Sequence, residues 1–163
     1  QFLKYMENNK KITFITGNKV KLKEFKILME GVDVEFEVKE LDLDECQGNA
    51  KDVAIRKAKL AIQYSHTPVL IDDVSFYMNA LNGLPGPYIK DFLACVQAEG
   101  LYKMLAGYED HSAYAQCIYA YCEDKDSEPI LFTGKIFGTV IEPQGGSKFK
   151  WGSAFRPDGY DCC

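Results

Sequence analysis

Two adjacent carboxylates, Asp72 and Asp73, directly follow the apolar run of residues 69–71. Like charges at this spacing repel each other unless a cation or several hydrogen-bond donors neutralise them. Carboxylate oxygens are preferred ligands of Mg²⁺, and open α/β sheets place their ligands at the carboxyl ends of buried strands. The pair therefore predicts a metal or ligand site at the end of a buried strand. The alternative is a pair of carboxylates that only caps the next segment.

A second acidic cluster lies between residues 41 and 48, where Asp42, Asp44 and Glu45 fall within four positions. A cluster of this kind is typical of a solvated turn. It gains a chemical role only if the folded chain brings Glu45 close to Asp73, because carboxylates from two distant segments can then share one cation.

The segment 16–21 (TGNKVK) joins a run of β-branched and aromatic residues to a helical pattern. A glycine turn at the start of a helix presents free backbone N–H groups to an anion, and Lys19 and Lys21 can add direct contacts to phosphate. The segment matches neither the Walker A pattern nor G-x-G-x-x-G. It indicates either part of a phosphate site or an ordinary strand-to-helix turn with solvated lysines.

The segment Gly83–Lys90 (GLPGPYIK) alternates glycine and proline. This composition predicts a stiff loop with a preset path, which places Lys90 with little loss of conformational entropy. The alternative is a purely structural loop, although loops this unusual often carry function.

Aromatic side chains are dense in the segment Phe149–Tyr160 (FKWGSAFRPDGY). Rings at this density can hold a nucleobase against their faces. Ordinary core packing produces the same composition, so both interpretations stay open.

Regular patterns between these segments predict the elements that position them. Strands are predicted at residues 12–16, 34–38, 69–71, 112–122 and 130–141. Helices are predicted at residues 19–29, 50–64, 88–96 and 100–106, and loops at 82–87 and 143–147. This order predicts an α/β domain with a mixed central sheet flanked by helices, in which the last two long strands are neighbours.

Composition limits the class of protein. The chain has 163 residues, of which 47% are hydrophobic, enough for a substantial core. The net charge of −5 argues against a nucleic-acid polymer as partner, because such proteins usually carry a basic face. Neither a membrane span nor a secretory leader is predicted, so we expect a cytoplasmic protein with no membrane partner. The six cysteines form no C-x-x-C pair, which favours free thiols over a zinc site.

The boundaries of the domain follow from the first residues. Met6 begins a stretch typical of a native start. We therefore expect residues 6–163 to form a single domain, and residues 1–5 to be an expression remnant or an upstream extension.

Taken together, these segments resemble the inosine triphosphate pyrophosphatase (Ham1-like) family. The motifs follow the family's order: T-G-N, an acid before Q-G, an apolar strand with an acidic pair, G-L-P-G-P-Y-I-K, F-x-W and F-x-P-D-G-Y. The resemblance extends from about Lys11 to Asp161, and Gly83–Lys90 is its most specific part. It implies two lobes with a cleft between them, and commonly a homodimer.

The resemblance also implies a reaction, the hydrolysis of non-standard purine nucleoside triphosphates (those of inosine, deoxyinosine and xanthosine) to a monophosphate and pyrophosphate. It implies that Glu45 and Asp73 bind Mg²⁺, with Mn²⁺ able to substitute, and that Asp73 orients or deprotonates the attacking water. The residues implied to bind the substrate are Thr16, Gly17, Asn18, Lys19, Lys21, Lys57, Asp72, Lys90, Phe149, Lys150, Trp151 and Gly152.

The chain departs from the family's pattern in two places. Gly152 follows Trp151, where the family usually has an aspartate that helps to read the base. The family normally continues with a further helix and a Ser-His-Arg stretch that holds the base, whereas this sequence ends at Cys163, so this stretch either lies beyond it or is absent. The alternatives to an active enzyme are therefore a nucleotide-binding relative with weak or lost catalysis, and an interaction protein that kept only the fold.

Overall fold

The computed structural model describes residues 11–144 and 151–161, and within them the chain divides into two compact units. The first unit comprises residues 11–73 and 118–132. The second unit comprises residues 74–117, 133–144 and 151–161. The extension expected at residues 1–5 lies outside the described residues.

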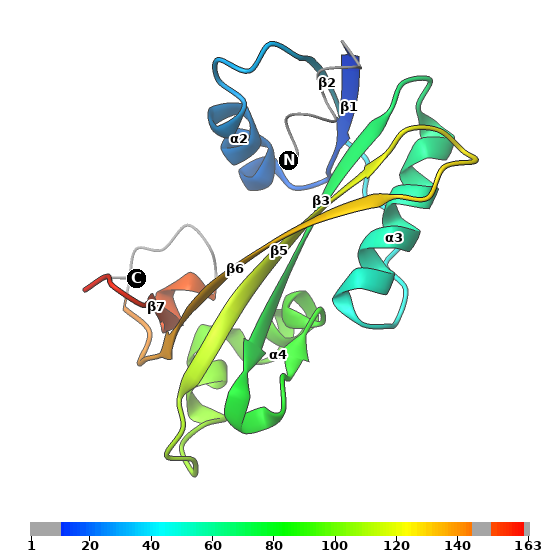
Figure 1. Cartoon of the computed structure of the whole chain (residues 1–163). Coiled ribbons are helices and arrows are strands. Elements are labelled where there is room, and N and C mark those ends of the chain that lie inside the picture. Colours follow the sequence, from blue (N-terminus) through cyan, green and yellow to red (C-terminus); the bar gives the residue numbers. More distant parts are fainter. Residues whose placement is uncertain (1–10, 145–150, 162–163) are drawn as a thin grey trace. The chain divides into compact units, whose positions relative to one another are not determined.

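Three long strands contribute residues to both units: β3 (Val69–Met78), β5 (Ser112–Cys122) and β6 (Ile130–Val140). The strand order is β2-β1-β3-β5-β6-β7, with β4 paired to β3 (Figure 1). The prediction that the last two long strands are neighbours is therefore confirmed.

The shorter strands make the sheet mixed. In the first unit, β1 (Lys11–Ile15) pairs in parallel with both β2 (Glu35–Lys39) and β3. In the second unit, β4 (Pro85–Gly86) is antiparallel to β3, and β7 (Phe155–Pro157) is antiparallel to β6. The predicted fold class, a mixed sheet flanked by helices, is confirmed.

Helix α2 (Lys19–Leu28) begins at Asn18, whose side-chain oxygen accepts hydrogen bonds from the backbone N–H of Val20 at 2.9 Å and of Lys21 at 3.4 Å. These bonds satisfy two of the donors that a helix leaves unpaired in its first turn. Gly31, with a φ of 81°, follows the last turn and adopts the left-handed backbone that commonly ends a helix.

Helix α3 (Ala50–Ala61) begins in the same way at Asn49, and a 3₁₀ turn (Ile62–Tyr64) continues it. The predicted helix over residues 50–64 is therefore confirmed, with a tightened last turn. The buried face of α3 consists mainly of alanine: Ala50, Val53, Ala54, Ala58 and Ala61. Side chains this small allow a helix to approach a sheet closely.

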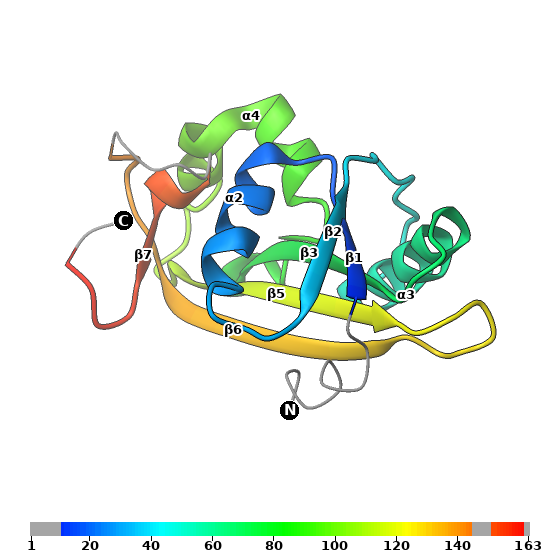
Figure 2. The same cartoon turned by 90° about the horizontal axis from the view of Figure 1, so that it is seen from above.

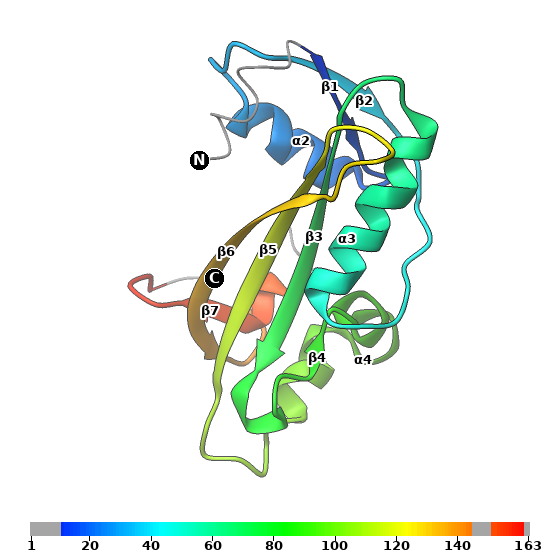
Figure 3. The ribbon, with the colours of Figure 1, turned by 45° about the vertical axis from the view of Figure 1, so that its right-hand side comes forward.

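The helices α2 and α3 cover opposite faces of the sheet in the first unit (Figures 2 and 3). On the α2 face, the ring of Phe25 stacks on Phe14 of β1 with 3.9 Å between centroids, and Leu70 of β3 belongs to the same cluster. Successive side chains of a strand point to alternate faces. Asp72 therefore lies on the face of Leu70, whereas Asp73 lies on the face covered by α3.

Hydroxyl groups join the entry of β3 to β1. The Oγ1 atoms of Thr13 and Thr67 are 2.6 Å apart, and the Ser65 hydroxyl donates to Thr13 Oγ1 at 3.1 Å. The backbone N–H of Thr13 also donates to the Pro68 carbonyl at 2.8 Å. These contacts support the register that places Thr13 opposite Val69.

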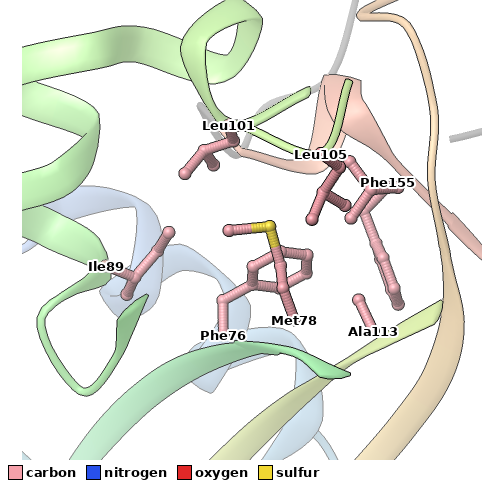
Figure 4. Close-up of a cluster of buried hydrophobic side chains, with 8 residues drawn as sticks. Phe76, Met78, Ile89, Leu101, Leu105, Ala113 and Phe155 are labelled. Atoms are coloured by element: carbon pink, nitrogen blue, oxygen red, sulfur yellow. The ribbon is translucent and has the colours of Figure 1, made fainter. Parts of the chain in front are cut away.

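The second unit contains a separate apolar core (Figure 4). Its buried members are Phe76, Met78, Ile89, Leu101, Leu105, Ala113, Val140 and Phe155. Ile89 and Leu101 belong to helix α4 (Ile89–Lys103), and Figure 4 shows them beside Phe76 and Met78 of β3. Phe76 and Met78 of β3 therefore pack in an apolar core.

Helix α4 is one element with a kink, where the sequence predicts two helices. Gln97 interrupts it with φ 58° and ψ −178°, between the two predicted segments. A side chain at Gly100 would overlap Val96, so the turn after the kink accommodates only glycine. The sequence thus located the interruption but not the continuity across it.

The sequence analysis misplaced the end of one strand and missed two short strands. β3 does not end at Ile71 but continues through the acidic pair to Met78, because both carboxylates find cationic partners and the apolar pattern then resumes. The predicted loop 82–87 contains β4, and β7 was not predicted at all. Both short strands depend on pairing with distant segments, which local composition does not reveal.

Three further expectations concern membrane spans, the loop at residues 143–147 and the division into domains. No helix within residues 11–144 and 151–161 combines the length and hydropathy needed to cross a membrane. The last three residues of the predicted loop 143–147 lie outside the described residues. The single domain over residues 6–163 and the cleft between two lobes stay predictions.

Candidate functional site

The ammonium group of Lys57 joins the two carboxylates that the sequence singles out as a metal pair. Its Nζ lies 2.9 Å from Glu45 Oε1 and 3.2 Å from Asp73 Oδ1. Helix α3 carries Lys57, β3 carries Asp73, and Glu45 lies in the segment before α3. The condition for a role of the second acidic cluster, that Glu45 approaches Asp73, is therefore met within the first unit.

Asp73 is buried and has an unsatisfied oxygen. Its Oδ2 has no hydrogen-bond partner among the described residues. Burial raises the pKa of this carboxyl above its ordinary value, although Lys57 and Lys21 act in the opposite direction. An unpaired buried carboxylate oxygen is costly in a fold optimised for stability alone, which makes Asp73 a candidate for chemistry.

Lys57 carries a firmly held positive charge. Burial acts to lower its pKa, but the charges of Asp73 and Glu45 and their hydrogen bonds outweigh burial, so the pKa is raised. The lysine is therefore an ammonium at neutral pH. It offsets much of the repulsion between the two carboxylates that it contacts.

The donors present fit a divalent cation of the magnesium type. Asp73 offers a free carboxylate oxygen, and Glu45 offers a second carboxylate beside the same lysine. Within the part of the chain that the structure describes, no group of three or more His, Cys, Asp or Glu side chains forms a metal cage. Mg²⁺ needs no such cage, because it commonly uses one or two carboxylates and keeps waters or substrate phosphates as its other ligands.

Asp72 and Lys21 form a second buried ion pair on the opposite face of β3. Lys21 Nζ lies 3.0 Å from Asp72 Oδ2 and 3.4 Å from the Asp72 carbonyl oxygen. The sequence analysis assigns both residues to one site but does not predict that they contact each other, although one signal was available. The signal was the alternation of a strand, which requires two adjacent carboxylates to face different helices.

The turn before α2 holds its own side chains in place. The backbone N–H of Asn18 donates to Thr16 Oγ1 at 3.1 Å, and the Asn18 side chain caps α2. A Cβ at Gly17 would lie 3.3 Å from Asp42, so this position favours glycine. Lys19 is exposed at the start of the helix. The local geometry explains the residue types, and phosphate binding stays a prediction.

The second unit contains the remaining described candidates. Lys90 is exposed in the first turn of α4. The ring of Trp151 lies 5.1 Å from Phe76 and 5.9 Å from Phe155, between centroids. Trp151 thus packs on the apolar core, and Gly152 begins the 3₁₀ turn after it. Phe149 and Lys150, also predicted to bind the substrate, lie outside the described residues.

Comparison with solved structures finds the same fold. A HAM1 protein from Coxiella burnetii gives a TM-score of 0.78 at 25% sequence identity, over 89% of this chain and 80% of that chain. A protein from Mycobacterium abscessus, described as a nucleoside-triphosphatase / dITP/XTP pyrophosphatase, gives a TM-score of 0.72 at 22% identity. That match covers 92% of this chain and 85% of the other.

Comparison of sequences identifies the family. The chain is 44% identical to the inosine triphosphate pyrophosphatase of Yarrowia lipolytica over 149 residues, which cover 91% of this chain and 79% of that protein. The model of the Ham1 family matches residues 12–163. Because both matches span most of the sequence, this chain belongs to the Ham1 family.

Proposed function

We propose that this protein hydrolyses non-standard purine nucleoside triphosphates, those of inosine, deoxyinosine and xanthosine, to the monophosphate and pyrophosphate, and so cleanses the nucleotide pool. The single observation that carries the proposal is the cluster of Glu45, Lys57 and Asp73 with its unpaired carboxylate oxygen. The 44% identity to a protein named inosine triphosphate pyrophosphatase supports it. Nothing in the described residues favours the binding-only alternative.

The proposed cofactor is a divalent cation, Mg²⁺ with Mn²⁺ able to substitute, held by Glu45 and Asp73. Such a cation, when bound, neutralises phosphate charge and polarises the phosphoryl group. Lys57 remains a full positive charge beside the same carboxylates and adds to this neutralisation.

Asp73 is the carboxylate that we propose to orient or deprotonate the attacking water. Its burial raises the pKa of its carboxyl, which makes the carboxylate a stronger base than an exposed one. The water oxygen forms a bond to the α phosphorus, the bond between that phosphorus and the bridging oxygen breaks, and pyrophosphate leaves. The proton of the water passes to Asp73 or to solvent.

The remaining predicted residues are proposed to hold the two ends of the substrate. The triphosphate is assigned to the turn before α2 and to cationic side chains: Thr16, Gly17, Asn18, Lys19, Lys21, Lys57 and Lys90. The base is assigned to Phe149, Lys150, Trp151 and Gly152. Backbone N–H groups at a helix start and lysine ammonium groups are typical partners of phosphate.

Selectivity against adenosine would follow from one atom. Inosine and xanthosine carry an oxygen acceptor at the purine 6 position, where adenosine carries an amino donor. A buried donor aimed at that oxygen would be left unpaired by adenosine, and an unpaired buried donor is strongly unfavourable.

We also propose a cytoplasmic homodimer. The described cysteines Cys46, Cys95, Cys117 and Cys122 form no disulfide within the described residues, which is compatible with a reducing compartment. The second unit exposes apolar side chains on β6, with Ile136 57% and Phe137 56% exposed. The proposal of a dimer rests on the Ham1 family resemblance, and these side chains, which point to opposite faces of β6, are available for contact with another copy.

Pyrophosphate release from inosine, xanthosine, adenosine and guanosine triphosphates, with and without Mg²⁺, tests the enzymatic proposal. Magnesium-dependent turnover of the first two substrates is expected. The Glu128→Gln variant, which alters an exposed ion pair with Lys59, serves as the control and should retain activity. Absence of turnover with all four triphosphates would contradict the proposal.

A further inference from the structure

Asp72 has the wrong charge for direct contact with a triphosphate. Its side chain is buried, with a relative exposure of 6%, and it lies next to the proposed catalytic Asp73. A carboxylate repels phosphate oxygens, and the repulsion is stronger where water is excluded. A direct substrate contact is therefore a poor explanation for this residue.

The contacts of Asp72 point to Lys21 instead. The Lys21 ammonium is within reach of two oxygens of the same residue, the carboxylate Oδ2 at 3.0 Å and the backbone carbonyl at 3.4 Å. The lysine side chain is only 18% exposed, so the pair is largely removed from solvent. Two acceptors on one rigid strand define where the end of this long side chain lies.

The position of Lys21 in helix α2 gives these contacts a consequence. Lys21 lies in the first turn, and its backbone N–H is one of the donors that Asn18 caps. Its backbone and its ammonium group are thus both fixed, the first by the cap and the second by Asp72. A lysine side chain that is free in solvent loses considerable rotamer entropy when it binds phosphate. A lysine whose ammonium is already held by the protein loses less entropy on binding.

We infer that Asp72 is a positioning residue, which acts on the triphosphate by holding the Lys21 ammonium and does not itself touch the substrate. The inference rests on the proposed function, because it assigns Lys21 to the triphosphate. It replaces the expectation that Asp72 binds the substrate directly. Lys21 retains one further N–H donor for phosphate while two face the oxygens of Asp72.

This inference and simple charge repulsion predict opposite signs for one substitution. If Asp72 contributed only negative charge, Asp72→Asn would strengthen binding of a polyanion. If Asp72 positions Lys21, the same substitution weakens binding, because the ammonium loses its charge-assisted partner. We expect a weakening of about tenfold, the usual effect of one hydrogen bond to a charged group.

The test is equilibrium binding of inorganic tripolyphosphate, with Mg²⁺ present, measured by calorimetry. Wild type, Asp72→Asn, Lys21→Met and the double variant form a cycle that isolates the coupling between the two residues. Asp72→Glu retains the carboxylate and should remain within about threefold of wild type. Glu128→Gln is the matched control, since it removes the carboxylate of an exposed ion pair in the same unit.

Thermal melting of each variant separates positioning from folding. If Asp72 has a purely structural role, its substitution lowers the melting temperature but leaves the affinity of the folded protein for tripolyphosphate unchanged. The effect on melting temperature is then the same whether residue 21 is Lys or Met. If Asp72→Asn does not fold, Asp72→Ser takes its place in the cycle.

The outcomes are distinct. The inference is supported if Asp72→Asn weakens tripolyphosphate binding in the wild-type background but changes it by no more than about twofold in the Lys21→Met background. Unchanged or tighter binding by Asp72→Asn overturns it, and so does an equal loss in both backgrounds. If wild type hydrolyses inosine triphosphate while either of these results holds, only the inference fails. If wild type neither binds tripolyphosphate nor hydrolyses inosine triphosphate, the proposed function fails and the inference with it.

Discussion

The two halves of strand β3 have opposite characters. The first half ends in Asp72 and Asp73, two buried carboxylates held by lysines from different helices. The second half contributes Phe76 and Met78 to an apolar core. A single strand therefore passes from a region of buried charge to a region of ordinary packing within five residues.

The two groups of residues differ in what they contribute to stability. Buried ion pairs are weak contributors to stability, because the loss of hydration offsets most of the attraction. An unpaired carboxylate oxygen adds a further cost. Apolar packing, in contrast, is the principal source of stability. Asp72 and Asp73 are thus explained by chemistry, and the apolar residues of β3 by the need to fold.

The largest expected effect is the loss of activity in Asp73→Asn. The substitution preserves shape but removes the charge proposed to bind the metal and to activate water. We expect kcat to fall by about 10²–10³-fold, the typical effect of removing one transition-state contact. The measurement is magnesium-dependent pyrophosphate release by protein shown to be folded. Turnover equal to that of wild type would remove Asp73 from the mechanism.

The next effect tests the apolar half of the same strand. Met78→Ala should lower the free energy of unfolding by about 2–3 kcal/mol, because it leaves a cavity in a core of fixed partners. Urea denaturation measures this loss. The kcat of the remaining folded protein should stay near the wild-type value. A large fall in kcat without a loss of stability would show that the second half of β3 also contributes to catalysis and would contradict the difference between the two halves.

A smaller effect concerns the pH dependence of stability. Burial raises the pKa of Asp73 in the folded protein. Protonated Asp73 therefore contributes to the free energy of unfolding, and this contribution is fully present below the pKa of the unfolded state, about 3.9. That stability is lost as the pH rises through the higher pKa of the folded state. Asp73→Asn lacks this loss, so the stability of the variant relative to wild type should increase with pH across this window and then become constant.

Denaturant unfolding of both proteins, with a chelator present and over a series of pH values, measures this trend. Lys57 does not disturb the comparison, because its raised pKa keeps it charged throughout the window. A difference that decreased with pH would mean that Asp73 is stabilised as the anion and would contradict the assigned direction.

The smallest effect is expected at an exposed ion pair. Lys59 and Glu128 lie 2.6 Å apart, but their side chains are 46% and 79% exposed. Glu128→Gln should change the free energy of unfolding by no more than about 0.5 kcal/mol, as is typical of surface pairs. The same denaturation assay measures it. A change as large as that of Met78→Ala would show that surface charge stabilises this fold unusually well.

Elements with strong local patterns could be predicted from the sequence. The strand at residues 112–122 matches β5 at both ends, and the helix after Asn18 has the cap that its sequence favours. The end of β3 was wrong because two acids resemble a terminator, whereas the folded chain supplies each with a lysine from a distant segment. Local composition contains no information about such partners.

The candidate site shows the same limit. The acidic clusters identified Glu45 and Asp73 and the family resemblance added Lys57, but the contact of both carboxylates with one ammonium required the fold. Trp151 left two interpretations open, and its ring packs against Phe76 and Phe155, while its contact with a base stays a proposal. The contact between Asp72 and Lys21 could have been anticipated in part, because adjacent residues of a strand must face opposite sides.

The hydroxyl contacts at the entry of β3 bear on how the family tolerates insertions and deletions. A shift of β3 by one residue against β1 would exchange the faces of Asp72 and Asp73 and separate each from its lysine. Length changes between Ser65 and Asp72 should therefore be rare among homologues. The largely exposed turn at residues 123–129 lies outside this constraint, so insertions and deletions are expected to be tolerated there.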